Sequence, residues 1–180
     1  STLSSSSAAS DVYKRQQLQR LEEQLAEHNI LLLFRPHPVQ DLSVFHKEEL
    51  PHIRIADDVF LASMECTLYE LLAQTDALIT DYSSVYFDYL LTDRPIALTI
   101  ADREEYFTRF TLAFPDYKEA VKGFYIETFS QLSSFLAEIA EGVDSAREER
   151  MPAKEKYHTK DAGNSAKAIV DLLEKEYRLK

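Results

Sequence analysis

The 180-residue sequence has only three glycines and one cysteine, and each scarcity excludes a class of site. The glycines, at positions 123, 142 and 163, cannot build a glycine-rich phosphate loop of either common type. The single cysteine, Cys66, excludes an internal disulfide framework and a multi-cysteine zinc site, and it fits a reducing compartment. Any phosphate site in this chain must therefore use another device.

Long apolar runs and an excess of positive charge are also absent. The longest apolar runs, such as Ile30–Phe34, fall far short of the roughly 20 residues that a membrane-spanning helix needs. The net charge of −11 disfavours a broad nucleic-acid-binding surface, so no nucleic-acid partner is expected. The histidines show no paired metal-ligand spacing, and neither a metal nor a cofactor is expected; they are His28, His37, His46, His52 and His158.

The first 16 residues differ in character from the rest of the chain. Ser6–Gln16 reads as the in-frame translation of a common transposase sequencing adapter. We therefore expect residues 1–16 to be an artefact and disordered, which would mean that the natural chain was cut upstream of Gln17. The alternative is a disordered natural tail rich in Ser and Ala, because chain termini often have this composition.

From Gln17 onward, short apolar segments alternate with segments of helical spacing. Strands are expected at 30–35, 52–56, 76–80, 95–100 and 124–128. Helices are expected at 17–29, 41–48, 66–74, 83–91, 129–140, 144–157 and 165–177. This alternation predicts an α/β domain with a parallel sheet and helices on both faces. Because ligands bind at the carboxyl ends of such strands, the loops after Arg35, Thr80 and Ile100 are the candidates.

The loop after Thr80 carries two serines where a helix should begin. The first turn of a helix has free N–H groups and a partial positive charge, and two added hydroxyls make an anion cradle without glycine. Ordinary helix capping is the competing interpretation, since Asp and Ser are favoured N-caps. Capping needs only one such residue, however, and four polar residues follow the apolar strand: Asp81, Tyr82, Ser83 and Ser84.

Four residues outside this loop are further candidates. His37 lies between two prolines that restrict it, and its ring could donate to a phosphate oxygen or act as an acid. Arg35 could also pair with phosphate, Asp88 could accept hydrogen bonds from ribose hydroxyls, and Asp102 could face the same cleft. Each has a structural alternative. His37 could be a loop histidine with a backbone partner, and Arg35 could only end its strand. Asp88 could be a solvated helix acid, and Asp102 could cap the next helix.

The segment Ala77–Leu91, which reads ALITDYSSVYFDYLL, resembles the CDP-glycerol glycerophosphotransferase family, the teichoic acid primases and polymerases. The family pattern is an apolar strand, then TDYSS, then a helix that contains FD, then a K/R-P pair before the next strand. In this chain the K/R-P pair lies within Asp93–Ile96, which reads DRPI. Weaker matches are Phe34–Pro38 to a K-x-H-P element, Asp102–Tyr106 to D-x-E-x-Y, Lys122–Phe124 to R-G-F, and Asp161–Leu173 to a closing D-G-x-x-S segment.

The resemblance implies a Rossmann-like fold. Residues 17–180 would be the C-terminal, donor-nucleotide half of a GT-B enzyme whose N-terminal acceptor half is missing. His37, Ser83 and Ser84 would contact the pyrophosphate of CDP-glycerol, with Asp81, Tyr82, Asp88, Arg35 and Asp102 also binding the donor. An acceptor hydroxyl would attack the glycerol-bearing phosphorus and release CMP. The general base is expected in the missing half, so this fragment alone should be inactive.

The resemblance also implies partners and a location. The donor would be CDP-glycerol and the acceptor a lipid-linked glycerophosphate polymer, used in the cytoplasm at the inner face of the cell membrane. Membrane contact is expected only through the missing region or the acceptor, because acidic chains are repelled by anionic lipid. Two alternatives stay open: a nucleotide-sugar half-domain of another GT-B enzyme, such as a glycosyltransferase or UDP-sugar epimerase, and a non-catalytic α/β interaction module.

Overall fold

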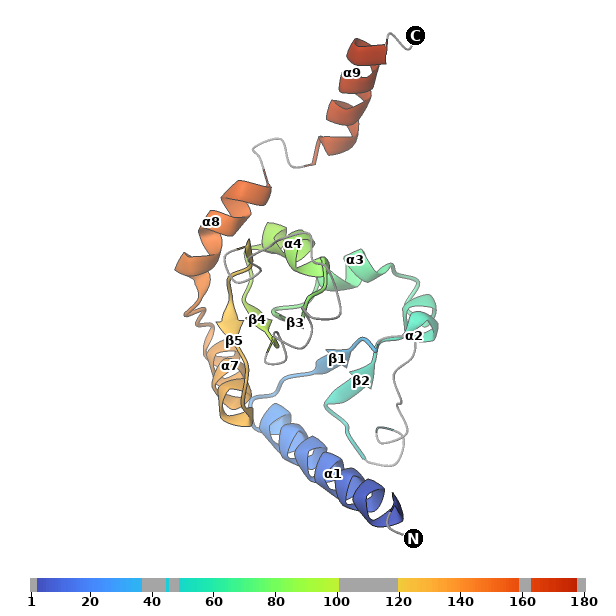
Figure 1. Ribbon diagram of the computed structural model, residues 1–180, viewed down its shortest axis with the longest axis vertical. Helices are drawn as coiled ribbons and strands as arrows, with labels where there is room; N and C mark the ends of the chain where they lie inside the picture. Colours follow the sequence, from blue (N-terminus) through green and yellow to red (C-terminus); the bar gives the residue numbers. More distant parts are fainter. Residues whose placement is uncertain (1–2, 37–44, 46–48, 101–119, 159–162, 178–180) are drawn as a thin grey trace. The chain divides into compact units, whose positions relative to one another are not determined.

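The computed structural model describes residues 3–36, 45, 49–100, 120–158 and 163–177 (Figure 1). Two compact units make up the fold. The first comprises Ser1–Ala77 and Ile126–Asp144, and the second comprises Leu78–Tyr125 and Ser145–Lys180. Every strand pair within them is parallel, which confirms the predicted α/β class and Rossmann-like character.

The first unit is built on a two-stranded parallel sheet. Leu32 lies opposite Ile53 and Phe34 opposite Ile55. Its elements are α1 (Leu3–Glu27), β1 (Leu32–Phe34), β2 (Ile53–Ile55), α2 (Asp58–Ser63), α3 (Leu68–Leu72) and α7 (Phe129–Glu141). One cluster of its buried core consists of Leu25, Leu50, Ile53 and Leu136. Apolar residues of both long helices thus cover the sheet, as their helical spacing predicts.

Helix α1 is tied to β2 by one carboxylate. Both carboxylate oxygens of Glu22 accept from the backbone N–H of His52, at 3.1 and 3.2 Å, and one lies 2.6 Å from His52 Nδ1. Leu18, Leu21 and Leu25 of the same helix pack in the core. Because α1 begins at Leu3, the segment expected to be disordered is helical; its origin in an adapter stays a prediction.

The second unit contains a three-stranded parallel sheet in the order β3-β4-β5. Leu78 lies opposite Ile96, and Ala97 opposite Phe124. Its elements are β3 (Leu78–Thr80), α4 (Val85–Tyr89), the 3-10 helix η2 (Leu90–Thr92), β4 (Ile96–Leu98), β5 (Phe124–Tyr125), α8 (Arg147–Tyr157) and α9 (Ser165–Tyr177). All three residues of the central strand β4 are buried, as its continuous apolar sequence predicts.

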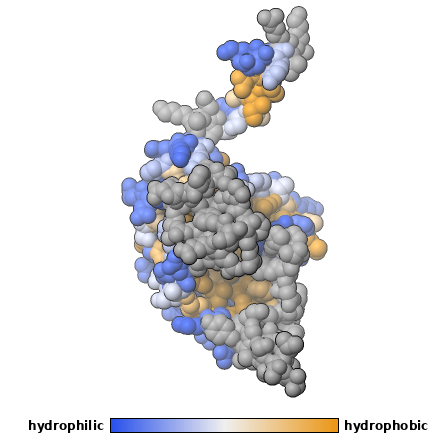
Figure 2. Space-filling view, viewed as in Figure 1, coloured by the Kyte–Doolittle hydropathy of each residue, from blue (hydrophilic) through white to orange (hydrophobic). Residues whose placement is uncertain are grey.

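The two C-terminal helices differ in their packing. Helix α8 buries Arg150 and Ala153, whereas α9 has no buried residue. Figure 2 shows apolar side chains gathered on α9, where Ile169, Val170 and Leu172 are more than half exposed. In the described part of the chain, no helix combines the length and apolarity that crossing a membrane would require.

All five expected strands are present, in two sheets rather than one. The helix expected from residue 66 begins only at Leu68, because Thr67 serves as its N-cap and accepts from the amide of Glu70. The expected helix 83–91 is divided into α4 and η2. Helix α2 was not predicted, since six residues give too short a periodic pattern. The expected helix 41–48 lies, apart from residue 45, outside the described residues.

Candidate functional site

The candidate site of the second unit starts where β3 ends. Thr80 is buried, and its carbonyl accepts from the amide of Thr99 at 2.9 Å and from the Thr99 hydroxyl at 3.3 Å. Thr99 directly follows β4, so the carboxyl ends of β3 and β4 lie side by side. The loop after β3 therefore leaves the sheet at the edge where ligands bind in parallel α/β folds.

Asp81 shapes this loop. Its Oδ1 accepts from the backbone N–H of Ser83 at 3.2 Å, the local turn that a short carboxylate side chain favours. The Ser83 hydroxyl lies 3.4 Å from the amide of Val85, at the long end of hydrogen-bond distance. Asp81 thus directs the chain into α4 so that two consecutive serines precede the helix.

Ser84 occupies the N-cap position of α4 without capping it. Its backbone is helical, with φ −63° and ψ −15°, and its side chain makes no capping hydrogen bond. A capping side chain normally requires an extended backbone, as at Thr67 and Thr128, which cap α3 and α7. Both serine side chains are exposed. The hydroxyl of Ser84 is therefore not used for capping and faces solvent.

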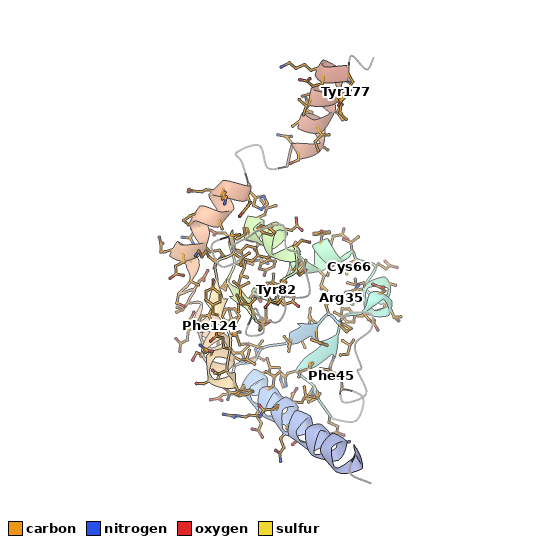
Figure 3. All side chains as sticks on the ribbon, in the orientation of Figure 1. Arg35, Phe45, Cys66, Tyr82, Phe124 and Tyr177 are labelled. Atoms are coloured by element: carbon orange, nitrogen blue, oxygen red, sulfur yellow. The ribbon has the colours of Figure 1, made fainter. Side chains whose placement is uncertain are left out.

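The other candidates of this loop lie close along the chain. Asp88 is exposed on α4, one helical turn after Ser84, as predicted. Tyr82 is half-buried within the loop (Figure 3). The structure therefore brings Asp81, Tyr82, Ser83, Ser84 and Asp88 into one unit, around the start of one short helix.

The helix α4 is held by aromatic packing and by the histidine that follows α8. Phe87 packs edge-on against Tyr157, with ring centroids 4.8 Å apart. The carbonyl oxygen of Phe87 lies 2.6 Å from Nε2 of His158, which donates to it. Sequence reasoning gave His158 no role; its only signal was its position just after a helix rich in charge.

Arg35 lies in the first unit, directly after β1 (Figure 3). Its guanidinium donates to the carbonyl of Ala56 at 2.9 Å and to Oδ1 of Asp58 at 2.6 Å. It thereby links the end of β1 to the start of α2, a contact that the sequence did not predict.

Two predicted site residues, His37 and Asp102, lie outside the described residues. Cys66 is half-buried just before the cap of α3, rather than on a helix as predicted. Among the described residues there is no group of three His, Cys, Asp or Glu side chains arranged to hold a metal ion. The site that the structure describes is therefore one of hydroxyl, carboxylate and backbone groups.

Comparison with known proteins shows what this chain resembles. Teichoic acid ribitol-phosphate polymerase TarK of Staphylococcus aureus is 28% identical over 84% of this chain and 28% of its own length. The teichoic acid ribitol-phosphate primase of Bacillus spizizenii is 29% identical over 68% of this chain and 31% of its own length. The glycerol-phosphate primase of the same organism is 38% identical over 42% of this chain and 18% of its own length.

The chain thus spans less than a third of the length of each of these curated relatives. A family model described as CDP-glycerol:poly(glycerophosphate) glycerophosphotransferase matches residues 6–175, which is nearly the whole chain. The match confirms the family expected from the TDYSS segment. The chain belongs to the CDP-glycerol:poly(glycerophosphate) glycerophosphotransferase family.

Proposed function

We propose that this chain is the donor-binding part of a transferase that moves a polyol phosphate from a CDP-linked donor to a teichoic acid or capsule-type acceptor. The observation that carries the proposal is the turn at Ser83 and Ser84, where two exposed hydroxyls follow the carboxyl end of a parallel strand and Ser84 does not cap its helix. Family membership supplies the donor class. We take CDP-glycerol as the donor and keep CDP-ribitol as the competitor, since the relatives' names include both polyols.

In this proposal the serine hydroxyls donate to the pyrophosphate oxygens of the donor. Hydrogen bonds to a charged group contribute about 1.5–3 kcal/mol each, which is enough to fix a diphosphate without a glycine-rich loop. Asp81 holds the turn, Asp88 accepts from ribose hydroxyls, and Tyr82 borders the donor. His37, Arg35 and Asp102 complete the proposed set of donor-binding residues.

The proposed reaction is attack by an acceptor hydroxyl on the polyol-bearing phosphorus, with CMP as the leaving group. Such a transfer depends on positioning and on stabilising charge on the phosphate oxygens rather than on covalent help from the protein. We place the general base in a part of the parent enzyme outside this chain, in the acceptor half of a GT-B fold. The chain alone should then bind donor and transfer little or nothing to an acceptor.

The acceptor is proposed to be a lipid-linked polymer at the inner face of the cell membrane. The net charge of −11 opposes direct binding of this chain to anionic lipid. Contact with the membrane would therefore occur through the acceptor or through other parts of the parent enzyme.

Calorimetric titration of the full chain tests the donor proposal. CDP-glycerol, CDP-ribitol, CMP and UDP-N-acetylglucosamine are titrated into the wild type and into Ser83→Ala/Ser84→Ala. We expect binding of a CDP-polyol that the double variant weakens at least about tenfold, since tenfold corresponds to only about 1.4 kcal/mol. A matched control is Ser133→Ala/Ser134→Ala, whose hydroxyls donate to carbonyls within α7.

Each contrary result points to a different reading. Equal donor affinity in wild type and Ser83→Ala/Ser84→Ala would remove the serine pair from the site. Preference for UDP-N-acetylglucosamine would place the chain with nucleotide-sugar enzymes. A folded chain that binds none of the four nucleotides would overturn donor binding and favour an interaction module in which the loop is purely structural.

A further inference from the structure

Tyr86, two residues after Ser84, is fully buried and bonded to a distant backbone segment. Its hydroxyl donates to the carbonyl oxygen of Lys122 at 2.9 Å, and its oxygen accepts from the Lys122 amide at 2.8 Å. One side chain therefore satisfies both backbone polar groups of Lys122, a residue 36 positions away. Tyr86 lies in the TDYSSVYFD segment and Lys122 in the KGF segment, and the proposed function gives Tyr86 no role.

The segment that Tyr86 holds is itself fixed in the sheet. Gly123 follows Lys122, and a Cβ at this position would lie 2.6 Å from the carbonyl oxygen of Ile96 on β4. Only glycine allows the chain to approach β4 so closely at the start of β5. Val121, on the other side of Lys122, is fully buried. Tyr86 is thus bonded to a part of the fold that has little freedom to move.

The helix that carries Tyr86 needs such an anchor. Helix α4 has five residues, and helices this short are not stable without tertiary contacts. Ser84 adds no capping hydrogen bond, and the Ser83 hydroxyl approaches the amide of Val85 only at 3.4 Å. The direction of α4, and with it the direction of the preceding turn, therefore depends on contacts with the rest of the unit. These are the bonds of Tyr86 to Lys122 and the contacts of Phe87 with Tyr157 and His158.

We propose that Tyr86 is a positioning residue of the donor site. Through Lys122 it fixes α4 and the Ser83–Ser84 turn relative to the sheet β3-β4-β5, so that the two serine hydroxyls are held ready for the donor phosphates. This inference rests on the proposed function for the identity of the ligand. Groups that bind a phosphate are effective only when their own positions are fixed by packing and hydrogen bonds behind them.

Tyr86→Phe tests the inference by removing one oxygen atom and keeping the ring. We expect the affinity for CDP-glycerol to fall about five- to tenfold, with an unchanged circular dichroism spectrum. The matched control is Tyr89→Phe, because Tyr89 is equally buried on the same helix. Tyr89→Phe should bind within twofold of the wild type; an equal loss in both variants would mean a general effect of removing a buried hydroxyl and would overturn the inference.

A second comparison separates positioning from general destabilisation. Tyr86→Phe is combined with Ser83→Ala/Ser84→Ala, and donor affinity is measured for the four combinations. If Tyr86 acts through the serines, its effect on affinity disappears once they are gone. An effect of the same size in both backgrounds would show that Tyr86 does not act through the serine hydroxyls.

Amide hydrogen exchange tests the positioning without any ligand. In the wild type, the amides of Tyr86, Phe87 and Lys122 should open together, with protection factors that agree within tenfold. In Tyr86→Phe, exchange should accelerate at least tenfold at residues 85–87 and not at β4. Independent opening in the wild type would overturn the inference. Joint opening in a chain that binds no donor would support Tyr86 as the anchor of the Ser83–Ser84 turn and would overturn the donor that the proposed function assigns to it.

Discussion

Asp93 and Arg147 lie 54 residues apart in the sequence, and their side chains form an ion pair of 2.7 Å. Asp93 closes η2 in the left-handed conformation, with φ 56°, and Arg147 is the first residue of α8. Lys154, two turns further along α8, lies 3.8 Å from the other carboxylate oxygen. Arg147 holds the pKa of Asp93 below its usual range, chiefly through this hydrogen bond. The carboxylate therefore fastens α8 to the turn that precedes β4.

Asp93→Asn should lower the free energy of unfolding at neutral pH by about 0.5–1 kcal/mol, the range for a partly exposed pair. Asparagine suits this test because it tolerates the left-handed conformation. The pKa of Asp93 is lower in the folded than in the unfolded protein. The ion pair therefore stabilises the fold fully at pH values above the unfolded pKa of Asp93. This contribution is lost as the pH falls through the folded pKa. Urea unfolding at pH 7 and pH 3 measures it; a difference between the proteins that persists unchanged at pH 3 would contradict this account.

Gly123→Ala should destabilise the second unit by about 1–3 kcal/mol or more, the usual effect of overpacking. The added Cβ would lie 2.6 Å from the carbonyl oxygen of Ile96, so β5 must move away from β4. Gly142→Ala is the matched control, because a Cβ at this position would meet no other atom. Its backbone is left-handed, with φ 68°, and this conformation alone should cost alanine about 1–2 kcal/mol. Parallel urea titrations compare them, and a smaller loss at Gly123 than at Gly142 would show that the strands adjust freely.

The sequence predicts the local elements of this fold better than their assembly. The strands at 32–34 and 96–98 are short apolar runs between helical patterns, and such runs need no distant information. The division of the five strands into two sheets depends on which backbones pair, and nothing in a three-residue strand specifies its neighbour. The predicted α/β class is therefore confirmed, while the single sheet expected from the alternation is observed as two.

The candidate site shows the same limit. The TDYSS segment was found because its polar residues interrupt an apolar pattern, and the structure places it after a strand as expected. The bond from Tyr86 to Lys122 could not be predicted, because a tyrosine on an apolar helix face gives no sign of its partner. Arg35 illustrates the reverse case: its type suggested phosphate, and only the structure shows its bonds to Ala56 and Asp58.

Deleting residues 1–16 should change the free energy of unfolding little, because the leucines of α1 that are described in the core lie after residue 16. Among the described side chains of α1, Leu18, Leu21 and Leu25 pack in the hydrophobic core and Glu22 holds His52; all four remain after this deletion. A matched deletion of residues 1–21 removes two of these leucines. Since both are half-buried, each should cost on the order of 1 kcal/mol, below the range for a fully buried leucine. Thermal and urea unfolding compare the two; a large loss on removing only residues 1–16 would argue that this segment belongs to the natural protein.

Tyr86 should make the second unit sensitive to alkali. Burial raises its pKa to about 12, although its hydrogen bond from the Lys122 amide opposes the shift. The pKa of Tyr86 is thus higher in the folded protein than in the unfolded chain, where it is near 10. Such a tyrosine contributes its full stabilisation when the pH is below the unfolded pKa. That contribution, on the order of 2 kcal/mol, is lost as the pH rises from about 10 to about 12.

Tyr86→Phe has no proton to lose at this position, so its unfolding free energy should fall less between pH 9.5 and pH 11.5 than that of the wild type. Tyr89→Phe retains the Tyr86 hydroxyl and should keep the full alkaline loss, which separates this tyrosine from the other nine in the chain. Urea unfolding followed at closely spaced pH values gives the slopes. Identical slopes in wild type and Tyr86→Phe would mean that the Tyr86 hydroxyl is accessible to hydroxide without unfolding, and that the anchor of α4 opens readily in the folded protein.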